Sequence, residues 1–481
     1  MNYKIIAKLL GLLIIIIGFS MLFAFGWGVY YNEPETEYFG YSIVICLSCG
    51  GLLYYLNKNA ETKMYRREAY IVVGLGWIVA GFFGALPYIM TDTLNTFADA
   101  IFESISGFTT TGSTVLSDIE AVSKCILFWR SLTHWLGGMG IIVLFVALFP
   151  FLGVGGKYLL KNETPGPVKE GIKNKTVHSA RYLWYIYLAI SALLTILLLL
   201  GGMSWFDALC HTFGTMATGG FSTLNKSVGG YNSRYFEIVI TIFMFMAGVN
   251  FTLYYNFLGG RWKTFFKDIE FKVYAFIILV CTILTTGLLY YYKYYPTILS
   301  SLRYAAFQVV SIITTTGFGT ADFNIWPPFC QLLFVSLMFF GGCAGSTGGG
   351  MKIIRIIILF KYAIQQVLRS LHPTAVYVLK IENHPFPKQT MHQILGFFVF
   401  AIGIFVFSSL FVALHNIDII TSTTSVTATL WNIGPGLAKV GAVENFGFLP
   451  ETVKYFLSLL MIIGRLEIFT IIVFFIPDFW K

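Results

Sequence analysis

The stretch Thr110-Thr111-Gly112-Ser113 ends a short, Ser/Thr-rich apolar segment that lies between two longer apolar runs. The same arrangement returns three more times, so that a glycine follows a short apolar segment in each of four gaps. The other three stretches are Ala217-Thr218-Gly219-Gly220, Thr315-Thr316-Gly317-Phe318 and Asn432-Ile433-Gly434-Pro435. This internal repetition decides the fold, because one chain that repeats a hairpin-like loop four times can build a closed ring by itself.

The repetition is visible in individual residues. Residues 100–112 and 305–317 are identical at seven of thirteen positions, which include three consecutive threonines and the final glycine. Residues 207–219 and 422–434 match them more weakly. Irregular backbone inside a membrane survives only where protein buries it or where it lines a wet cavity. Four such segments in register therefore favour re-entrant loops over interfacial hairpins.

The composition places the chain in a membrane. Of its 481 residues, 57% are hydrophobic and 11% are charged, whereas soluble proteins carry roughly a quarter charged residues. The apolar runs are long enough to cross a hydrocarbon core of about 30 Å, and helices are expected because backbone groups in lipid must be paired within each segment. Ten crossings are predicted near residues 5–30, 39–57, 69–90, 125–153, 180–201, 234–258, 272–292, 328–360, 392–414 and 452–476.

Basic residues gather in alternate loops. These loops lie near residues 58–67, 157–181, 261–272 and 361–388. The loop at 32–39 instead carries three glutamates. The positive-inside rule then predicts cytoplasmic N- and C-termini and four glycine loops that face outward. This pattern accounts for the net charge of +9 without nucleic acid as a partner, and the basic loops are expected to attract anionic membrane lipid.

The sequence carries no enzyme motif. The glycines before Lys352 lie within a predicted span rather than after a strand, so a phosphate-binding loop is not predicted. The seven cysteines mostly lie in apolar runs, where free cysteine behaves as a small hydrophobe. Acidic residues inside the runs are few and unclustered, which disfavours a membrane-embedded transferase. We therefore expect neither enzymatic activity nor a bound organic cofactor.

The residue types at the four loops suit a cation that leaves water. Such a cation needs oxygen ligands in return, and backbone carbonyls supply them where glycine permits the required dihedral angles. Each short helix would also point the negative end of its dipole inward. No loop carries a carboxylate beside its glycine, which favours a monovalent ion. The candidate filter residues are Thr110, Thr111, Gly112, Ala217, Thr218, Gly219, Thr315, Thr316, Gly317, Asn432, Ile433 and Gly434.

A second feature is the glycine-rich stretch 341–350 (GGCAGSTGGG), which interrupts the predicted span 328–360. Six of its ten residues are glycine, and each costs a helix interior about 1 kcal/mol relative to alanine. This density predicts an unwound loop rather than close helix packing through small residues.

Charged and polar side chains also occur inside apolar runs. Arg465 lies in the last predicted span, where it is expected to pair with Glu467, to bond a carbonyl, or to place a fixed positive charge near the pore. Arg130 and His134 lie one turn apart and are expected to snorkel or to support a filter loop. His211 is expected to be a packed, hydrogen-bonded histidine.

The chain resembles a known family. The resemblance is carried by the four glycine stretches, residues 129–140 (WRSLTHWLGGMG), the stretch 341–350 and residues 464–467 (GRLE). The chain is similar to the Trk/Ktr/HKT superfamily of potassium transporters, and within it to the bacterial TrkH-type transmembrane subunit. The resemblance covers nearly the whole chain. It implies an all-α integral membrane protein that resembles a tetrameric potassium channel fused into one chain. The implied parts are two N-terminal helices at 1–64 and four pore repeats at 65–160, 161–260, 261–370 and 371–481.

The resemblance also implies a function. We expect potassium uptake across the cytoplasmic (inner) membrane of a bacterium, with potassium as the transported ion and an intramembrane gating loop. The implied gate residues are Gly341, Gly342, Gly345, Ser346, Thr347, Gly348, Gly349, Gly350 and Arg465. The implied partners are a second copy, in a homodimer, and a cytosolic ATP/NAD-binding regulatory ring of TrkA type, with the basic loops 57–68 and 155–181 as candidate docking surfaces. In plant relatives, serine in the first loop goes with sodium permeation, so Gly112 favours potassium. A sodium-permeable or sodium-coupled transporter of the same fold is the alternative.

Overall fold

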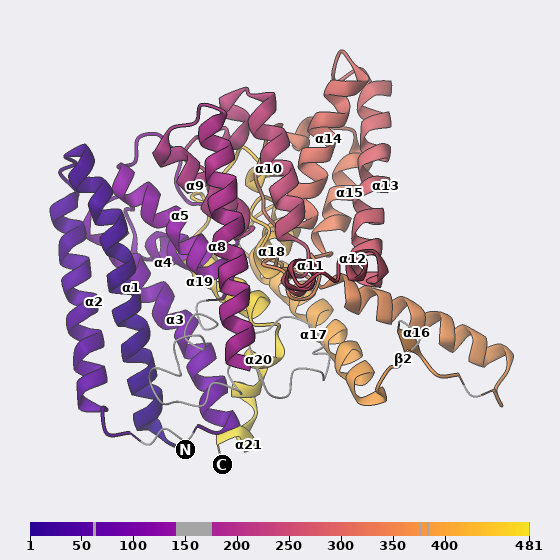
Figure 1. Cartoon of the computed structure of the whole chain (residues 1–481), viewed down its shortest axis with the longest axis horizontal. Coiled ribbons are helices and arrows are strands. Elements are labelled where there is room, and N and C mark those ends of the chain that lie inside the picture. Colours follow the sequence, from indigo (N-terminus) through magenta and orange to yellow (C-terminus); the bar gives the residue numbers. More distant parts are fainter. Residues whose placement is uncertain (61–63, 141–175, 376, 382–383, 481) are drawn as a thin grey trace.

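The computed structural model describes residues 1–60, 64–140, 176–375, 377–381 and 384–480. Helices run from one end of the molecule to the other, and both termini lie at the same end (Figure 1). Helices α1 (Tyr3–Tyr31) and α2 (Thr36–Leu56) form an antiparallel pair at one edge. Glu33, in the turn between them, accepts the N–H groups of Lys124 and Cys125 at 2.5 and 2.9 Å. This contact places the start of α5 (Lys124–Gly138) at the end of the molecule opposite the N-terminus.

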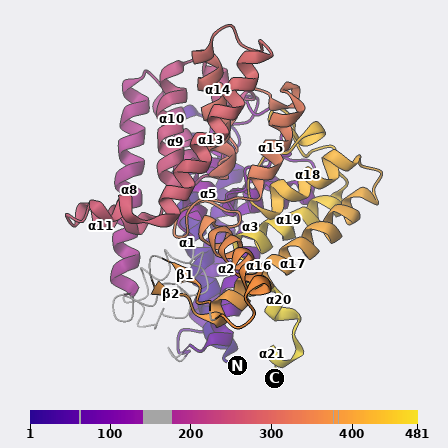
Figure 2. The same cartoon turned by 90° about the vertical axis from the view of Figure 1, so that its right-hand side faces the viewer.

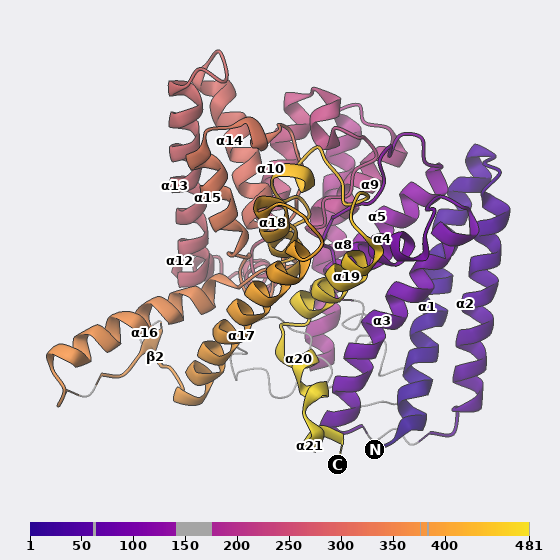
Figure 3. The ribbon, with the colours of Figure 1, turned by 180° about the vertical axis from the view of Figure 1, so that it is seen from behind.

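The order long helix, short helix, glycine turn, helix recurs four times along the rest of the chain (Figures 1–3). The four sets are α3 (Arg66–Met90), α4 (Phe97–Phe108) and α5; α8 (Thr176–Leu200), α9 (Trp205–Met216), α10 (Arg234–Ala247) and α11 (Phe251–Leu258); α13 (Ile269–Tyr291), α14 (Ile298–Ile313), α15 (Pro328–Met338) and α16 (Ile353–Leu371); and α17 (Lys388–Ala413), α18 (Ile419–Leu430), α19 (Glu451–Arg465) and α20 (Phe469–Ile472). Among the described residues, the regular structure is completed by four short 3-10 helices, the short helices α12 (Lys263–Lys267) and α21 (Pro477–Trp480), and an antiparallel pair of two-residue strands, β1 (Lys380–Ile381) and β2 (His384–Pro385). The predicted all-α class is confirmed.

Long apolar helices account for most of the predicted crossings. Among the described residues, six helices are long and apolar enough to cross a membrane, namely α1, α2, α3, α8, α13 and α17. The pairs α10–α11 and α19–α20 raise the number to eight if each is one span. The predicted span 125–153 begins with α5, and its second half lies outside the described residues. The predicted span 328–360 is interrupted between α15 and α16, and α16 then runs sideways from the bundle (Figures 1 and 3).

Two of the predicted crossings, 234–258 and 452–476, are sharply bent. The axes of α10 and α11 differ by 92°, and those of α19 and α20 by 110°. After Gly248, Asn250 starts the new helix α11 by accepting the N–H of Thr252 on its side chain. At the second bend, Glu467 and Ile468 both have a φ of 58°, which costs a residue with a β-carbon roughly 1–2 kcal/mol. Tertiary contacts must therefore impose this bend.

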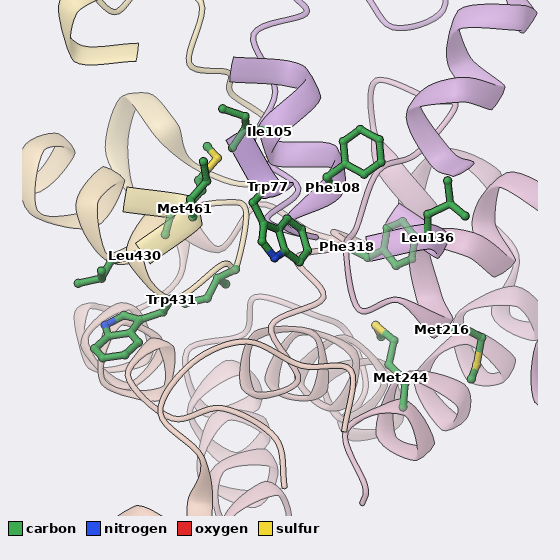
Figure 4. Close-up of a cluster of buried hydrophobic side chains, with 14 of the residues drawn as sticks. Trp77, Ile105, Phe108, Leu136, Met216, Met244, Phe318, Leu430, Trp431 and Met461 are labelled. Atoms are coloured by element: carbon green, nitrogen blue, oxygen red, sulfur yellow. The ribbon is translucent and has the colours of Figure 1, made fainter. Parts of the chain in front are cut away.

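The core lies where the short helices end. Phe108, Met216 and Leu430 are the last residues of α4, α9 and α18, and all three are fully buried. Figure 4 shows Phe108 near Trp77 of α3, and Leu430 near Trp431, the residue that follows it at the end of α18. Apolar packing from several repeats thus fixes the position of the turns that follow the short helices.

Candidate functional site

The four short helices begin alike. Each N-cap side chain accepts the backbone N–H three residues on, which satisfies one of the unpaired donors of a helix N-terminus. The cap distances are 3.1 Å from Thr96 to Asp99, 3.1 Å from Ser204 to Asp207, 3.2 Å from Thr297 to Ser300 and 2.9 Å from Asp418 to Thr421. Equivalent caps set the same starting point in all four repeats.

The helices also end alike. Each is followed by one capping residue and then by a residue in the left-handed region, namely Thr110, Thr218, Thr315 or Asn432, with φ between 54° and 59°. The next N–H turns back to the helix in every repeat, through the bonds Thr111 to Ser106, Gly219 to Gly214, Thr316 to Ser311 and Ile433 to Ala428. Ala217 is the capping residue of its repeat.

This geometry corrects the sequence register of the second repeat. A left-handed glycine comes two residues after each of the four left-handed residues: Gly112, Gly220, Gly317 and Gly434, with φ of 82°, 80°, 80° and 102°. The residue equivalent to Gly112 is therefore Gly220, whereas the sequence analysis placed Gly219 there. Thr218 is followed by two glycines, and only backbone dihedral angles tell them apart. Gly219 is instead equivalent to Thr111, Thr316 and Ile433.

The four turns close into a ring. A β-carbon on Gly112 would lie 2.0 Å from the Gly219 carbonyl oxygen, and one on Gly220 would lie 2.0 Å from that of Thr316. A β-carbon on Gly317 would lie 2.2 Å from the Ile433 oxygen, and one on Gly434 would lie 2.9 Å from the Thr111 oxygen. Each repeat thus touches the next, and the fourth touches the first. The four glycines also line one cavity of about 110 Å³.

Hydroxyl groups brace the turns from behind. Ser106 donates to the Ser113 carbonyl at 2.6 Å, and the equivalent Ser311 donates to the Phe318 carbonyl at 2.7 Å. The first and last repeats are joined where the Asn432 amide donates to Thr111 Oγ1 at 2.9 Å. Within the described part of the chain, Thr110 Oγ1 and Asn432 Oδ1 are buried without a hydrogen-bond partner. These two oxygens are available to a ligand.

A buried ion pair supports the first two turns. The Arg130 Nε lies 2.5 Å from Glu103 Oε1, and both side chains are at most 2% exposed. Glu103 also accepts the N–H of Val115 at 2.9 Å, while Arg130 donates to the Ser222 carbonyl at 3.1 Å. The guanidinium lies 3.5 Å from the centre of the Phe221 ring. Of the two roles expected for Arg130, the structure shows loop support.

Both histidines are packed and hydrogen-bonded. His134 Nδ1 lies 2.7 Å from the Gly107 carbonyl oxygen, and its ring stacks on Phe221 with centroids 4.0 Å apart. His211 lies 2.8 Å from the Asp207 carbonyl oxygen and 3.0 Å from Ser222 Oγ. His134 therefore supports a loop, one of the two roles expected for it, and His211 is packed and hydrogen-bonded as expected.

The glycine-rich stretch 341–350 is an unwound loop against the third and fourth turns. The Gly349 N–H donates to Thr315 Oγ1 at 2.7 Å. A β-carbon on Gly348 would lie 3.0 Å from the Thr314 carbonyl oxygen, and one on Gly349 would lie 2.7 Å from that of Trp431. The loop also fills the bend after α10, where the Cys343 N–H donates to the Gly248 carbonyl at 2.8 Å. The predicted break is therefore present, and it contacts two of the four turns.

Two cations bind carbonyl oxygens of this loop. Arg465, the last residue of α19, donates to the Thr347 carbonyl at 2.9 Å and to the carbonyls of Gly137 and Gly138 at 2.6 and 2.9 Å. Of the contacts expected for Arg465, the structure therefore shows the carbonyl bond, while Glu467 forms an ion pair with Arg355 at the start of α16. Lys352, which is 1% exposed, donates to the carbonyls of Gly348 and Gly349.

Sequence reasoning missed Lys352 as a site residue. A lysine two residues after a glycine run, inside an apolar span, was the available signal, because such a charge needs a partner. It also missed Glu270, a 6% exposed carboxylate near the start of α13 that accepts two backbone N–H groups at the loop. Glu270 lies far from the loop in sequence, so no local pattern could have assigned this contact.

The fold and the site define a class of protein: a helical membrane protein in which four repeats of one chain close a ring of backbone turns over an unwound loop. A family model described as TrkH, cation transport protein, matches residues 37–481. The chain therefore belongs to the TrkH family, and it is a transporter rather than an enzyme.

Individual relatives match along the whole chain. The chain is 38% identical over 484 residues to the Trk system potassium uptake protein TrkH of Salmonella typhimurium and to that of Escherichia coli K12, with 100% of every chain covered. It is 32% identical over 483 residues to the Trk system potassium uptake protein TrkG of Escherichia coli K12, covering 100% of this chain and 99% of the relative. The crystal structure of the potassium transporter TrkH from Vibrio parahaemolyticus matches with a TM-score of 0.90 and 35% identity, covering 100% of both chains.

Proposed function

We propose that this chain takes up potassium across the cytoplasmic membrane of a bacterium, through a filter built from its four glycine turns. The observation that carries the proposal is the ring, in which the glycine of each repeat lies against a carbonyl of the next. Backbone carbonyls at this spacing can replace the water lost by a dehydrated cation. Relatives that are 38% identical over their full length are named potassium uptake proteins.

The proposed filter follows the corrected register. Its glycines are Gly112, Gly220, Gly317 and Gly434, and its carbonyls belong to Thr111, Gly219, Thr316 and Ile433. Thr110, Thr218, Thr315 and Asn432 would offer side-chain oxygens at one end of it. No carboxylate belongs to these positions, which suits a monovalent ion. Gly112→Ser is expected to raise sodium flux relative to potassium flux, and an unchanged ratio would count against this filter.

The proposed gate is the loop at 341–350 with Arg465. It touches the third and fourth turns through Gly348 and Gly349, so it stands where an ion leaving the filter would pass. Deletion of Gly345 to Gly349 should raise rubidium flux in the absence of a regulatory partner. Unchanged flux and unchanged regulation in the deletion variant would remove the loop from the mechanism.

The proposed assembly is a homodimer that docks a cytosolic, nucleotide-binding ring of TrkA type on its basic inner face. The support is the name of the relatives, which are subunits of a Trk system, and the positive charge of the loops around 57–68 and 155–181. The second loop lies largely outside the described residues. The proposal also includes four pore repeats at 65–160, 161–260, 261–370 and 371–481, and a cytoplasmic position for both termini.

Growth tests the function directly. A bacterium that lacks its own potassium uptake systems should grow at low potassium when this chain and its regulatory partner are expressed. Absence of growth with well-expressed, membrane-inserted protein and the partner present would refute the proposal.

A further inference from the structure

The two ends of the loop meet at its base. The Gly341 N–H donates to the Met351 carbonyl at 2.8 Å, and Phe340 and Met351 form a parallel bridge. The chain therefore leaves α15 and enters α16 at nearly the same place. We define the base as residues 341–344 and 351–354, and the tip as residues 345–350.

One carboxylate oxygen holds both sides of this base. Glu270 Oε1 accepts the Ala344 N–H at 2.8 Å and the Ile354 N–H at 3.0 Å. Ala344 precedes the tip and Ile354 follows it. Glu270 comes from α13, the first long helix of the same repeat, and is 6% exposed. The contact therefore ties the loop to a helix that is separate from the filter turns.

The chemistry of the contact is specific. Ile354 lies in the first turn of α16, where N–H groups have no partner within the helix and where the helix dipole favours a negative charge. Ala344 lies in irregular backbone, whose buried N–H groups need a partner from elsewhere. Glu270 satisfies both requirements with one atom.

The tip is held by different groups. Its contacts include Thr315 in the third filter turn, Arg465 in α19, Lys352 of the base, and Phe251 in α11, whose N–H donates to the Gly345 carbonyl at 3.0 Å. These groups belong to the filter, to the second and last repeats and to the loop itself. Lys352 links base and tip, but both Glu270 hydrogen bonds end on the base. The tip contacts to the filter and to α19 can therefore break while the base remains attached to α13.

We propose that Glu270 is a positioning residue that anchors the base of the loop to α13, so that opening moves the tip alone. The inference rests on the proposed function only in treating this loop as the gate. The anchor itself is a statement about which part of the loop is fixed, and it can be tested without any ion flux.

Cys343 reports on the anchor. It precedes Ala344, and its side chain is 1% exposed, so it should react slowly with a maleimide. The full chain in liposomes is labelled, and modification of Cys343 is followed by mass spectrometry. Glu270→Met keeps the side-chain length and removes the acceptor, and we expect its labelling rate to rise at least about tenfold, equivalent to about 1.4 kcal/mol. Glu270→Gln keeps one acceptor oxygen for both N–H groups and should stay within about threefold of the wild type.

Asp268→Ala is the matched control. Asp268 caps the same helix by accepting the Phe271 N–H at 2.9 Å, a hydrogen bond outside the loop. Its Cys343 rate should equal that of the wild type. Equal rates for Glu270→Met and the wild type would overturn the proposal, and so would a Glu270→Gln or Asp268→Ala rate as high as that of Glu270→Met.

Hydrogen exchange in the wild-type chain decides the question if Glu270→Met does not fold. The amides of Ala344 and Ile354 should exchange more slowly than that of Gly349 in the tip. Equal rates would overturn the proposal. Rubidium flux measured with the regulatory partner present is a separate test: a wild-type chain that then carries neither potassium nor rubidium contradicts the proposed function, while the labelling and exchange results still decide the role of Glu270.

Discussion

The four left-handed glycines differ in how closely the next repeat approaches, and this difference predicts a graded loss of ion selectivity. Alanine would bring a β-carbon to within 2.0 Å of a carbonyl oxygen at Gly112 and Gly220, 2.2 Å at Gly317 and 2.9 Å at Gly434. Real β-carbons essentially never lie under 3.0 Å from such an atom. The carbonyl or the turn must therefore retreat by about 1.0 Å at the first two positions, about 0.8 Å at Gly317 and about 0.1 Å at Gly434.

All four alanine variants share the strain of a left-handed backbone, roughly 1–2 kcal/mol each. The differences in selectivity loss between them should therefore reflect how far the neighbouring carbonyl oxygen must move. A loss of about 1.4 kcal/mol in the preference for one ion lowers a selectivity ratio tenfold. We expect the potassium-to-sodium flux ratio to fall at least about tenfold for Gly112→Ala and Gly220→Ala. The fall should be smaller for Gly317→Ala and under about threefold for Gly434→Ala.

The assay is rubidium uptake into proteoliposomes in competition with sodium. Gly202→Ala is the control, because Gly202 has a φ of 91° but no heavy atom within 4 Å of its β-carbon position. It carries the backbone strain without touching the ring, and its flux ratio should be that of the wild type. The reasoning is refuted if the four filter variants lose selectivity equally, if Gly434→Ala is the most affected, or if Gly202→Ala behaves like them.

Three further outcomes are expected. Arg465→Ala removes donors to the Thr347 carbonyl and should raise partner-free rubidium flux; equal or lower flux in folded protein would contradict this. Arg130→Gln leaves the Glu103 carboxylate buried without its cation, which should cost roughly 3–5 kcal/mol and lower the midpoint of thermal unfolding in detergent by several degrees, whereas an unchanged midpoint would contradict it. The hydrogen bond from Asn225 lowers the pKa of Asp118. The folding stability that this hydrogen bond contributes is therefore present at neutral pH and is lost only as pH falls below about 4. A loss of stability between pH 7 and pH 5 that Asn225→Ala abolishes would refute this.

The sequence was informative where a local pattern sets the backbone. Threonine runs before Gly112 and Gly317 predicted turns that the structure contains, and six glycines in ten residues predicted the break after α15. The register of the second repeat could not be read in the same way. Thr218 is followed by Gly219 and Gly220, and either glycine satisfies a residue pattern. Only the left-handed dihedral angle of Thr218 selects Gly220.

The helix bends and the partners of buried charges could not be predicted from short stretches of sequence, for a different reason. Hydropathy averages over a whole span, so it does not register the change of direction after Gly248 or after Arg465. The bends arise because distant backbone occupies the gap, as where Cys343 donates to the Gly248 carbonyl. Likewise, Arg465 could be assigned a partner only after the glycine-rich loop and α5 had been brought to it.

If the loop at 341–350 is the gate proposed above, its closed position would follow from how its carbonyls are satisfied. Carbonyl oxygens that face an ion path attract cations, and here Arg465 and Lys352 already bind those of Thr347, Gly348 and Gly349. Hydrogen bonds to charged groups contribute roughly 1.5–3 kcal/mol each. If opening the loop breaks one such bond to each cation, the closed loop is more stable than the open loop by about 3–6 kcal/mol. That range corresponds to an open fraction of about 1% or less. Under the proposed gating, a regulatory partner would have to supply only a few kcal/mol of differential binding to open the loop, and removal of either cation alone should leave it partly open rather than fully released.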